Sequence, residues 1–304
     1  MGTFLSYNAA IIESASLLET TSLPPLLFLP RVLMSFAHLL PAVIAISKQA
    51  GSAILAVYGQ DDFNISHKQD ASPLTAADLA AHRVIVAGLQ QLTPEVPVLS
   101  EESAAVAWSE RQQWKRYWLV DPLDGTKEFI KRNGEFTVNI ALIDNGVPVL
   151  GVVYVPVLQW CYSGARGEGA WIERDATTLP ITVSPIVDGQ PQLRVVASRN
   201  HRGDELDSWL ARVEQQFPQV ELVSMGSSLK ICLVAEGKAD IYPRLALTSE
   251  WDTAAAQAVL EAAGGLLVDY DGNEYRYNRK QDLLNPYFYA IGDSTQGLPL
   301  ALGR

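Results

Sequence analysis

Two aspartates separated by two residues are the part of this sequence best suited to chemistry. Asp121 and Asp124 lie in the run Asp-Pro-Leu-Asp-Gly-Thr, which follows the apolar β-type segment 117–120. The proline restricts the backbone of the residue before it, and Gly125 lets a ligand approach the main chain closely. Both carboxylates can therefore converge on one point beside a helix start, where cations and phosphate bind together. A simple capped turn would explain the glycine and one aspartate, but not a second carboxylate beside Thr126.

Two further acidic positions could join this pair. Glu101 begins a Glu-Glu pair after the β-type run 96–99, and Asp252 follows a tryptophan directly before an alanine-rich helix. Each has an ordinary alternative, because most glutamate pairs face water and Asp252 could serve only as a helix N-cap. With Asp121 and Asp124 they offer four hard oxygen ligands, the kind that Mg²⁺ prefers. Two such ions about 3.5 to 4 Å apart can activate a water and stabilise the leaving ester oxygen of an in-line displacement.

These motifs resemble those of the inositol-monophosphatase superfamily. The superfamily has a Glu-Glu pair after a strand, an Asp-Pro-x-Asp-Gly-Thr motif and a later Trp-Asp at a helix start, and all three occur here in order. The resemblance extends over about residues 32–285. A chance match to the five fixed residues of the central motif has an expectation on the order of one in ten thousand.

The resemblance implies a role for each residue of the motifs. The implied metal ligands are four carboxylates and one backbone carbonyl: Glu101, Asp121, Leu123, Asp124 and Asp252. Asp78 and Thr126 resemble the pair that orients the attacking water, and Glu101 is the third expected catalytic residue. Asp78 also stands in a capping box with Thr75, so a purely structural role for it stays open. The implied cofactor is Mg²⁺, with about two or three ions in the site.

Residues outside the shared core resemble the bacterial 3'(2'),5'-bisphosphate nucleotidase branch. The central motif continues as Lys-Glu-Phe, and a later Gly-Ser-Ser-Leu-Lys run is followed by Tyr-Pro-Arg. The substrate-binding residues that this resemblance implies are Gly125, Thr126, Lys127, His201, Ser227, Lys230 and Arg244. An ordinary capped helix with two surface cations is the alternative for the Gly-Ser-Ser run, and a surface loop residue is the alternative for His201. The implied reaction removes the 3'-phosphate of adenosine 3',5'-bisphosphate and leaves AMP.

The elements that must position these residues are helices alternating with antiparallel hairpins. Apolar periodicity predicts a helix over 32–58, in which Pro41 is either the true start or a kink, and another over 75–92. Strands at 136–143 and 149–155 flank an Asn-Gly turn, which is a hairpin signal. We expect further strands at 96–99, 117–120, 193–197, 220–223, 239–242 and 266–269, and further helices at 127–132, 204–217, 227–236 and 252–263.

This order lacks a regular βαβ rhythm, so it favours the α+β class. The resemblance implies a layered α-β-α-β-α sandwich with the active site between two subdomains. We expect an N-terminal extension at 1–30, a metal-binding α+β subdomain at 31–184 and a nucleotide-binding α/β subdomain at 185–304.

Composition limits the partners and the compartment. A net charge of −11 argues against a nucleic acid polymer as partner and against broad attraction to an anionic membrane. Cys161 and Cys232 lack metal-ligand spacing and are expected to be core residues, which suits a reducing cytoplasm. Prolines, an arginine and a histidine interrupt the apolar stretch 23–46, so we expect no spanning helix. The first thirty residues lack a basic start followed by a compact apolar run and a small-residue cleavage site, so we expect no secretory signal. Weak peripheral association with the cytoplasmic side of the inner membrane stays open, as does the oligomeric state.

Two other functions also stay open. One is an inositol monophosphatase or sugar phosphatase with the same metal site, and the other is a nucleotide-binding regulatory protein without catalysis. One position departs from the pattern of the superfamily. Glu250 precedes Trp251 where an apolar residue is expected, and its carboxylate either perturbs the metal affinity or points into solvent.

Overall fold

The structure is a computed structural model, and it describes residues 35–60, 66–67, 73–187, 189–197 and 203–292. Residues from Ser35 onward make one compact unit. The expected extension at 1–30 and the candidate residue His201 lie outside the described residues.

A seven-stranded sheet spans the first half of the described chain. Its strands lie in sequence order, and only the pair β3–β4 is parallel. They are β3 (Val98–Ser100), β4 (Arg116–Asp124), β5 (Thr137–Asp144), β6 (Val147–Val155), β7 (Trp160–Ala165), β8 (Gly169–Arg174) and β9 (Thr177–Ile181). The central strands β5 and β6 are almost entirely buried, as expected of strands covered on both faces. The predicted hairpin is confirmed: Asn145 and Gly146 both have positive φ, which a tight primed turn requires.

Two long helices cover the outer face of this sheet. They are α1 (Leu40–Tyr58), preceded by the 3₁₀ turn η1 (Ala37–Leu39), and α2 (Ala76–Leu92). Pro41 lies in the first turn of α1, so it marks the start of the helix, and the kinked alternative is wrong. Residues Ala37–Tyr58 are long and apolar enough to cross a membrane by length and composition. Val43, Ala50 and Ile54 of α1 are fully buried in the core, and this packing accounts for the apolar character of the helix.

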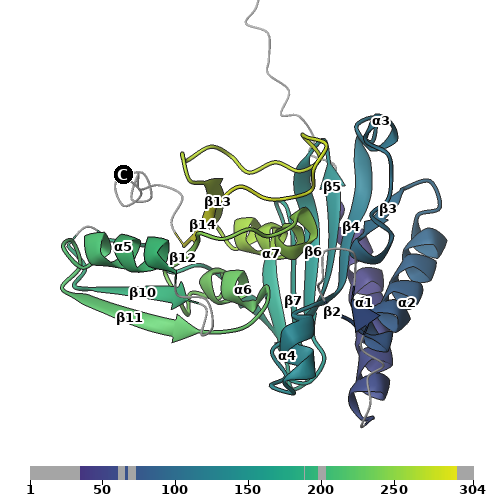
Figure 1. Ribbon diagram of the computed structural model, residues 1–304, viewed down its shortest axis with the longest axis horizontal. Helices are drawn as coiled ribbons and strands as arrows, with labels where there is room; N and C mark the ends of the chain where they lie inside the picture. The colour runs from purple at the N-terminus through teal and green to yellow at the C-terminus, as the bar shows by residue number, and fades with distance from the viewer. Residues whose placement is uncertain (1–34, 61–65, 68–72, 188, 198–202, 293–304) are drawn as a thin grey trace, which may run out of the picture. The chain divides into compact units, whose positions relative to one another are not determined.

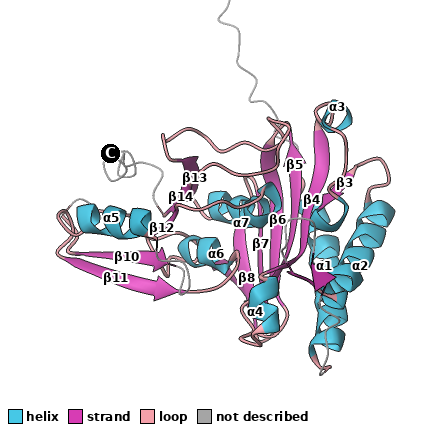
Figure 2. Cartoon of the chain, in the orientation of Figure 1, coloured by secondary structure: helices cyan, strands magenta, loops and turns pink. Residues whose placement is uncertain are grey.

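A mixed five-stranded sheet follows, in the order β11-β10-β12-β14-β13. Its strands are β10 (Gln192–Ala197), β11 (Gln219–Ser224), β12 (Ile241–Arg244), β13 (Leu266–Asp269) and β14 (Phe288–Ile291). Helix α5 (Asp204–Val213) covers one face through buried Trp209 and Val213. Helices α6 (Leu229–Ala235) and α7 (Glu250–Ala262) pack between the two sheets. Figures 1 and 2 show the resulting order of layers, which confirms the predicted α-β-α-β-α sandwich.

The remaining elements are short. They are β1 (Ser66–His67), β2 (Pro73–Leu74), η2 (Glu101–Ser103), α3 (Trp108–Arg111) and α4 (Thr126–Ile130). The first sheet ends at Ile181 and the second begins at Gln192, on either side of the predicted boundary at residue 184. Since the residues from Ser35 onward form a single compact unit, the division into two subdomains stays a prediction.

Helix α7 lies unusually close to the first sheet. A Cβ atom built at Gly151 of β6 would collide with the carbonyl oxygen of Ala255, and one built at Gly164 of β7 would lie 2.9 Å from the Cα of Val259. Glycine in a strand interior commonly marks such a close approach. These two glycines therefore fix the position of the helix whose first turn carries Asp252.

Candidate active site

An irregularity in strand β4 brings Asp121 and Asp124 together. Asp121 pairs with Asn139 and Asp124 pairs with Thr137, so β4 holds one more residue than β5 between the two pairs. Such a bulge re-aims side chains that would otherwise alternate between the two faces of a strand. The Asp121 carboxylate also accepts a hydrogen bond from the Leu123 N–H, at 3.0 Å, which fixes its orientation. The local sequence thus directs both carboxylates to one side.

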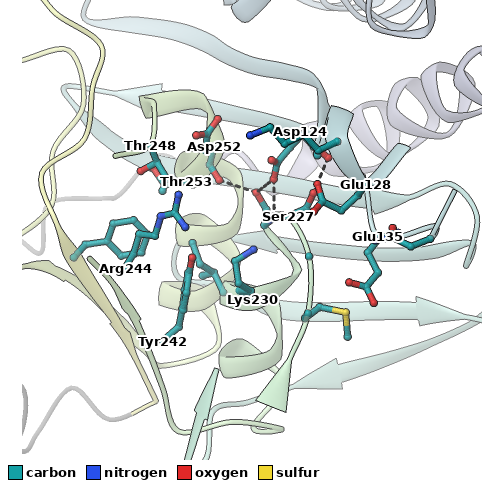
Figure 3. A pocket seen from close by; sticks show the side chains of 18 residues that line it. Asp124, Glu128, Glu135, Ser227, Lys230, Tyr242, Arg244, Thr248, Asp252 and Thr253 are labelled. Carbon is teal, nitrogen blue, oxygen red and sulfur yellow. Dashed lines mark hydrogen bonds between the residues drawn. The ribbon is translucent and has the colours of Figure 1, made fainter. Parts of the chain in front are cut away.

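Three carboxylates meet at this point. One oxygen from each of Asp121, Asp124 and Asp252 lies within 4.8 Å of the others. The Asp121 side chain is buried, whereas Asp124 and Asp252 are half-buried and line a cavity. Figure 3 shows Asp124 and Asp252 on either side of the start of α6. Glu101, in η2, forms a hydrogen bond with Asp121 and adds its charge to both Asp121 and Asp252.

The cluster lacks enough positive charge of its own to balance these carboxylates. Burial, followed by the charges of Glu101 and Asp124, raises the pKa of Asp121 well above its ordinary value. Burial and the charge of Asp124 raise the pKa of Asp252 to about 8. Like charges held this close disfavour ionisation unless a cation joins them. A set of hard carboxylate oxygens with an unmet demand for positive charge therefore fits a divalent cation such as Mg²⁺.

Helix capping positions two of the carboxylates. Ser249, rather than Asp252, is the N-cap of α7, so the N-cap alternative for Asp252 is wrong. Asp252 is the third helical residue and accepts a hydrogen bond from the Ser249 N–H at 2.8 Å. Asp78 repeats this arrangement in α2, where its Oδ2 atom accepts from the Thr75 N–H at 2.8 Å. A capping box leaves the second oxygen of the acid available for another partner.

Both carboxylate oxygens of Asp78 have partners. Its Oδ1 atom lies 3.4 Å from the Thr126 hydroxyl, while Oδ2 caps the helix. The Thr126 hydroxyl is also 3.5 Å from the carbonyl oxygen of Leu123. Both contacts lie at the long end of the hydrogen-bond range. The expected pair is thus brought together, while its part in catalysis stays a prediction.

The Gly-Ser-Ser run at the start of α6 contacts Asp124. The Ser227 hydroxyl donates to the carbonyl oxygen of Asp124 at 2.6 Å. Gly125 has a φ of 93°, and a Cβ atom there would collide with the Ser227 hydroxyl oxygen. This glycine therefore permits both the turn after Asp124 and the close approach of the serine. Ser227 itself adopts a φ of 48°, which is uncommon for a residue with a side chain.

A cavity of about 170 Å³ opens beside the acidic cluster. Five of the predicted substrate-binding residues line it: Gly125, Lys127, Ser227, Lys230 and Arg244. In Figure 3, the Lys230 and Arg244 side chains point from α6 and β12 toward Asp252 and Ser227. Loss of water lowers the pKa of Lys230 to about 8, with Asp124 opposing the shift and Arg244 adding to it. The cavity therefore presents cationic groups next to carboxylates, which suits an anion that is bound together with a metal ion.

Several lining residues were not predicted from the sequence. They are Glu128, Asn133, Glu135, Met225, Gly226, Ser228, Ile231, Tyr242, Thr248, Thr253 and Phe288. Glu128, Gly226, Ser228 and Tyr242 stand inside the runs that carried the resemblance, so their proximity in sequence was the available signal. Phe288 belongs to β14, a strand that the sequence pattern did not reveal, and nothing in its local sequence signals the site.

Glu250 does not point into solvent. Its side chain is 3% exposed and accepts hydrogen bonds from the Asn278 N–H, at 3.0 and 3.1 Å to its two oxygens. Burial raises the pKa of Glu250 to about 7, against the opposing effects of this N–H and of the Arg111 guanidinium. Arg111 is also buried and donates to Asn278 Oδ1 at 2.5 Å and to the Gln281 carbonyl at 2.6 Å. Glu250, at the start of α7, thus holds the segment around Asn278 in place.

Comparison with known proteins agrees with this geometry. Residues 37–292 match the model of the Inositol monophosphatase family. A protein of Salmonella typhimurium named 3'(2'),5'-bisphosphate nucleotidase CysQ is 53% identical over 251 residues, which are 82% of this chain and 98% of that protein. The protein of the same name from Buchnera aphidicola is 41% identical over 256 residues, covering 83% of this chain and 93% of its own.

Solved structures give the same result. The crystal structure of CysQ from Bacteroides thetaiotaomicron, described as a bacterial member of the inositol monophosphatase family, is 45% identical with a TM-score of 0.73. It matches 84% of this chain and 98% of its own. A Thermotoga maritima IMPase shares the fold at 22% identity, with a TM-score of 0.69 over 87% of this chain and 96% of its own. The chain belongs to the inositol monophosphatase family.

Proposed function

We propose that this protein is a Mg²⁺-dependent phosphomonoesterase that hydrolyses adenosine 3',5'-bisphosphate to AMP and phosphate. The observation that carries the proposal is the position of three converging carboxylates at the edge of a cavity that also holds Lys230 and Arg244. Relatives at 53% and 41% identity carry the name 3'(2'),5'-bisphosphate nucleotidase, which favours this substrate over inositol and sugar phosphates.

The acidic cluster would hold the metal. Glu101, Asp121, Asp124 and Asp252, with the Leu123 carbonyl, are the proposed ligands, for about two or three ions. When bound, Mg²⁺ would lower the pKa of a water and neutralise charge that develops on the leaving oxygen. Asp78 accepts from the Thr126 hydroxyl and so leaves the threonine oxygen able to orient a water molecule. The N–H groups of Gly125 and Thr126 start a short helix and suit the phosphate that is removed.

The other side of the cavity would bind the rest of the nucleotide. Lys230 and Arg244 supply charge for the phosphate that does not react, and Lys127 and Ser227 lie on the same cavity wall. His201 is proposed as a further phosphate contact on resemblance alone. The charge of −11 belongs to the whole chain, so Lys127, Lys230 and Arg244 can still make this one cavity attractive to a substrate with two phosphate groups.

We also propose a cytoplasmic location and a small molecule, not a nucleic acid polymer, as the partner. Both cysteines are buried and free, as expected of core thiols in a reducing compartment. The predicted role of Cys161 and Cys232 as core residues is confirmed.

A substrate panel tests this proposal. Phosphate release would be measured from adenosine 3',5'-bisphosphate, inositol 1-phosphate and fructose 1,6-bisphosphate at equal concentrations with Mg²⁺. We expect the nucleotide to be the preferred substrate by kcat/KM, with AMP as the product. Preference for inositol or sugar phosphate would overturn the assignment of the cavity while keeping the metal site. Absence of release from every substrate would favour a regulatory nucleotide-binding protein.

A further inference from the structure

Ser228 makes three hydrogen-bond contacts at the acidic cluster, although it is neither a proposed metal ligand nor a proposed substrate contact. Its N–H donates to Asp124 Oδ2 at 2.6 Å, and its hydroxyl donates to the same oxygen at 2.7 Å. The hydroxyl also lies 2.7 Å from the carbonyl oxygen of Asp252. The serine is 4% exposed and therefore offers little surface to a ligand. Ser228, the residue directly before α6, thus contacts the carboxylate of Asp124 and the main chain of Asp252.

Two buried polar residues of strand β5 complete a chain that ends at Asp124. The Asn139 amide donates to the Ser228 hydroxyl oxygen at 2.8 Å. The Thr137 hydroxyl in turn donates to the Asn139 amide oxygen at 3.0 Å. Thr137 is fully buried and Asn139 is 1% exposed. Every donor in this chain points toward the Asp124 carboxylate, so the hydrogen bonds polarise one another in the same direction.

Helix capping does not explain this arrangement. Ser228 occupies the N-cap position of α6, but its side chain makes no capping hydrogen bond. Its single hydroxyl proton has two acceptors, Asp124 Oδ2 and the Asp252 carbonyl, and a charged carboxylate is the stronger one. The two donors from Ser228 hold one Asp124 oxygen in place and so fix the orientation of a carboxylate that has an oxygen within 4.8 Å of those of Asp121 and Asp252.

We propose that Ser228 and Asn139 are positioning residues for the Asp124 carboxylate, and that they thereby set the affinity of the acidic cluster for divalent metal. The inference rests on the proposed function, since it assumes that this cluster binds metal. Partners that orient a metal ligand through hydrogen bonds change metal affinity about 10- to 100-fold when they are removed. Ser228 adjoins Ser227 on the cavity wall, so the same contacts also tie the metal site to the nucleotide side of the cavity.

Binding of Mn²⁺ to the metal-free protein, measured by electron paramagnetic resonance, tests this inference without relying on activity. Ser228→Ala removes the hydroxyl and keeps the backbone N–H, Ser228→Thr keeps a hydroxyl, and Asn139→Leu removes the amide donor. Ser163→Ala is the matched control, because Ser163 is a buried serine of β7 away from the cavity. Circular dichroism and thermal unfolding of each metal-free variant establish that it is folded.

We expect Ser228→Ala to weaken Mn²⁺ binding by about 10-fold or more, and Ser228→Thr and Ser163→Ala to bind like the unaltered chain. Because Asn139 acts through Ser228, the variant that combines Ser228→Ala with Asn139→Leu should bind Mn²⁺ no more weakly than Ser228→Ala alone. Unchanged binding in folded Ser228→Ala, or fully additive losses in the double variant, would overturn the inference. If Ser228→Ala does not fold, unchanged binding in Asn139→Leu overturns it instead. Absence of Mn²⁺ binding by the unaltered chain would overturn the proposed metal site as well.

Discussion

At the residue scale, the acidic cluster is held together at a cost to the metal-free fold. Asp121 is buried beside Glu101 and Asp124, and each of these charges raises its pKa. A buried carboxyl without a compensating charge destabilises the folded chain whenever it must ionise. Function, rather than stability, therefore explains why acids occupy these positions, and substitutions that remove charge should separate the two properties.

Asp121→Asn should stabilise the metal-free protein. The amide keeps the shape of the side chain and can still accept from the Leu123 N–H, while it removes one charge from the cluster. In EDTA, we expect the unfolding temperature to rise by about 2 to 4 °C, which corresponds to an increase of about 1 kcal/mol in the free energy of unfolding. Differential scanning calorimetry checks this, and an unfolding temperature below that of the unaltered chain would show that the cluster is not strained by charge.

The stability of the metal-free protein should also depend on pH through Asp252. Its pKa is about 8 in the folded chain and near 3.8 in its ordinary state, so the folded chain holds a proton that the unfolded chain has lost between these values. The free energy of unfolding should therefore fall as pH rises from about 5 to 8. Urea denaturation across this range in EDTA measures the slope. Asp252→Asn retains an acceptor for the Ser249 N–H and should reduce this dependence of the unfolding free energy on pH. An identical slope in both proteins would contradict the raised pKa of Asp252 as its cause.

At the element scale, the position of Asp252 depends on how closely α7 approaches the first sheet. Gly151 and Gly164 leave no room for side chains beneath this helix. The helix in turn presents a run of small buried residues, Ala254, Ala255 and Ala256. Small residues on both the first sheet and α7 thus determine how closely the first turn of α7, which carries Asp252, approaches Asp121 and Asp124.

Gly151→Val should therefore affect both stability and the metal site. The added side chain would meet the Ala255 backbone, and overpacking of this kind costs about 1 to 3 kcal/mol. Displacement of α7 should also weaken Mn²⁺ binding. Thr178→Val, which exchanges one β-branched side chain for another on the exposed strand β9, is the control for valine itself and should change neither property. Wild-type metal affinity in a folded Gly151→Val protein would argue against this role for the close contact.

Much of the fold could be predicted from apolar patterns. The two long helices, the Asn-Gly hairpin and the strand before Asp121 have strong periodicity or turn signals, and the structure contains all of them. Strands β7 to β9 were missed because their apolar alternation is weak: β7 and β8 contain glycines, β8 ends in two charged residues, and β9 reads Thr-Thr-Leu-Pro-Ile. Strand β14 was missed because it is a run of only 4 residues. The boundaries of α6 differ because Ser227 adopts a left-handed backbone that no propensity indicates.

The candidate site, too, could be predicted only in part. The acids were recognisable because carboxylates in a fixed motif are rare, and the structure brings Asp121, Asp124 and Asp252 together. The contact between Ser228 and Asn139 was not recognisable, because 89 residues separate the two and their approach depends on how the start of α6 packs against β5. The anchoring role of Glu250 could not be predicted either, since its partner Asn278, and Arg111, which donates to Asn278, come from distant segments.

At the scale of the whole molecule, metal and fold should be linked by mass action. A ligand that binds only the folded state stabilises it by about 2.7 kcal/mol at a concentration 100 times its Kd. Saturating Mg²⁺ should therefore raise the unfolding temperature by about 5 °C or more over EDTA. Because the chain carries a net charge of −11, NaCl of equal ionic strength must serve as the control for screening. An equal shift with NaCl would mean that no specific site is filled.

The most direct test of the acidic cluster as a catalytic metal centre is phosphate release from adenosine 3',5'-bisphosphate by EDTA-treated protein, before and after Mg²⁺ is restored. The same assay on Asp121→Asn, checked for native circular dichroism, tests the residue that lies deepest in the cluster. We expect release from the unaltered chain only with Mg²⁺, and none above background from Asp121→Asn under either condition. Release in the presence of EDTA, or from folded Asp121→Asn, would contradict the central claim.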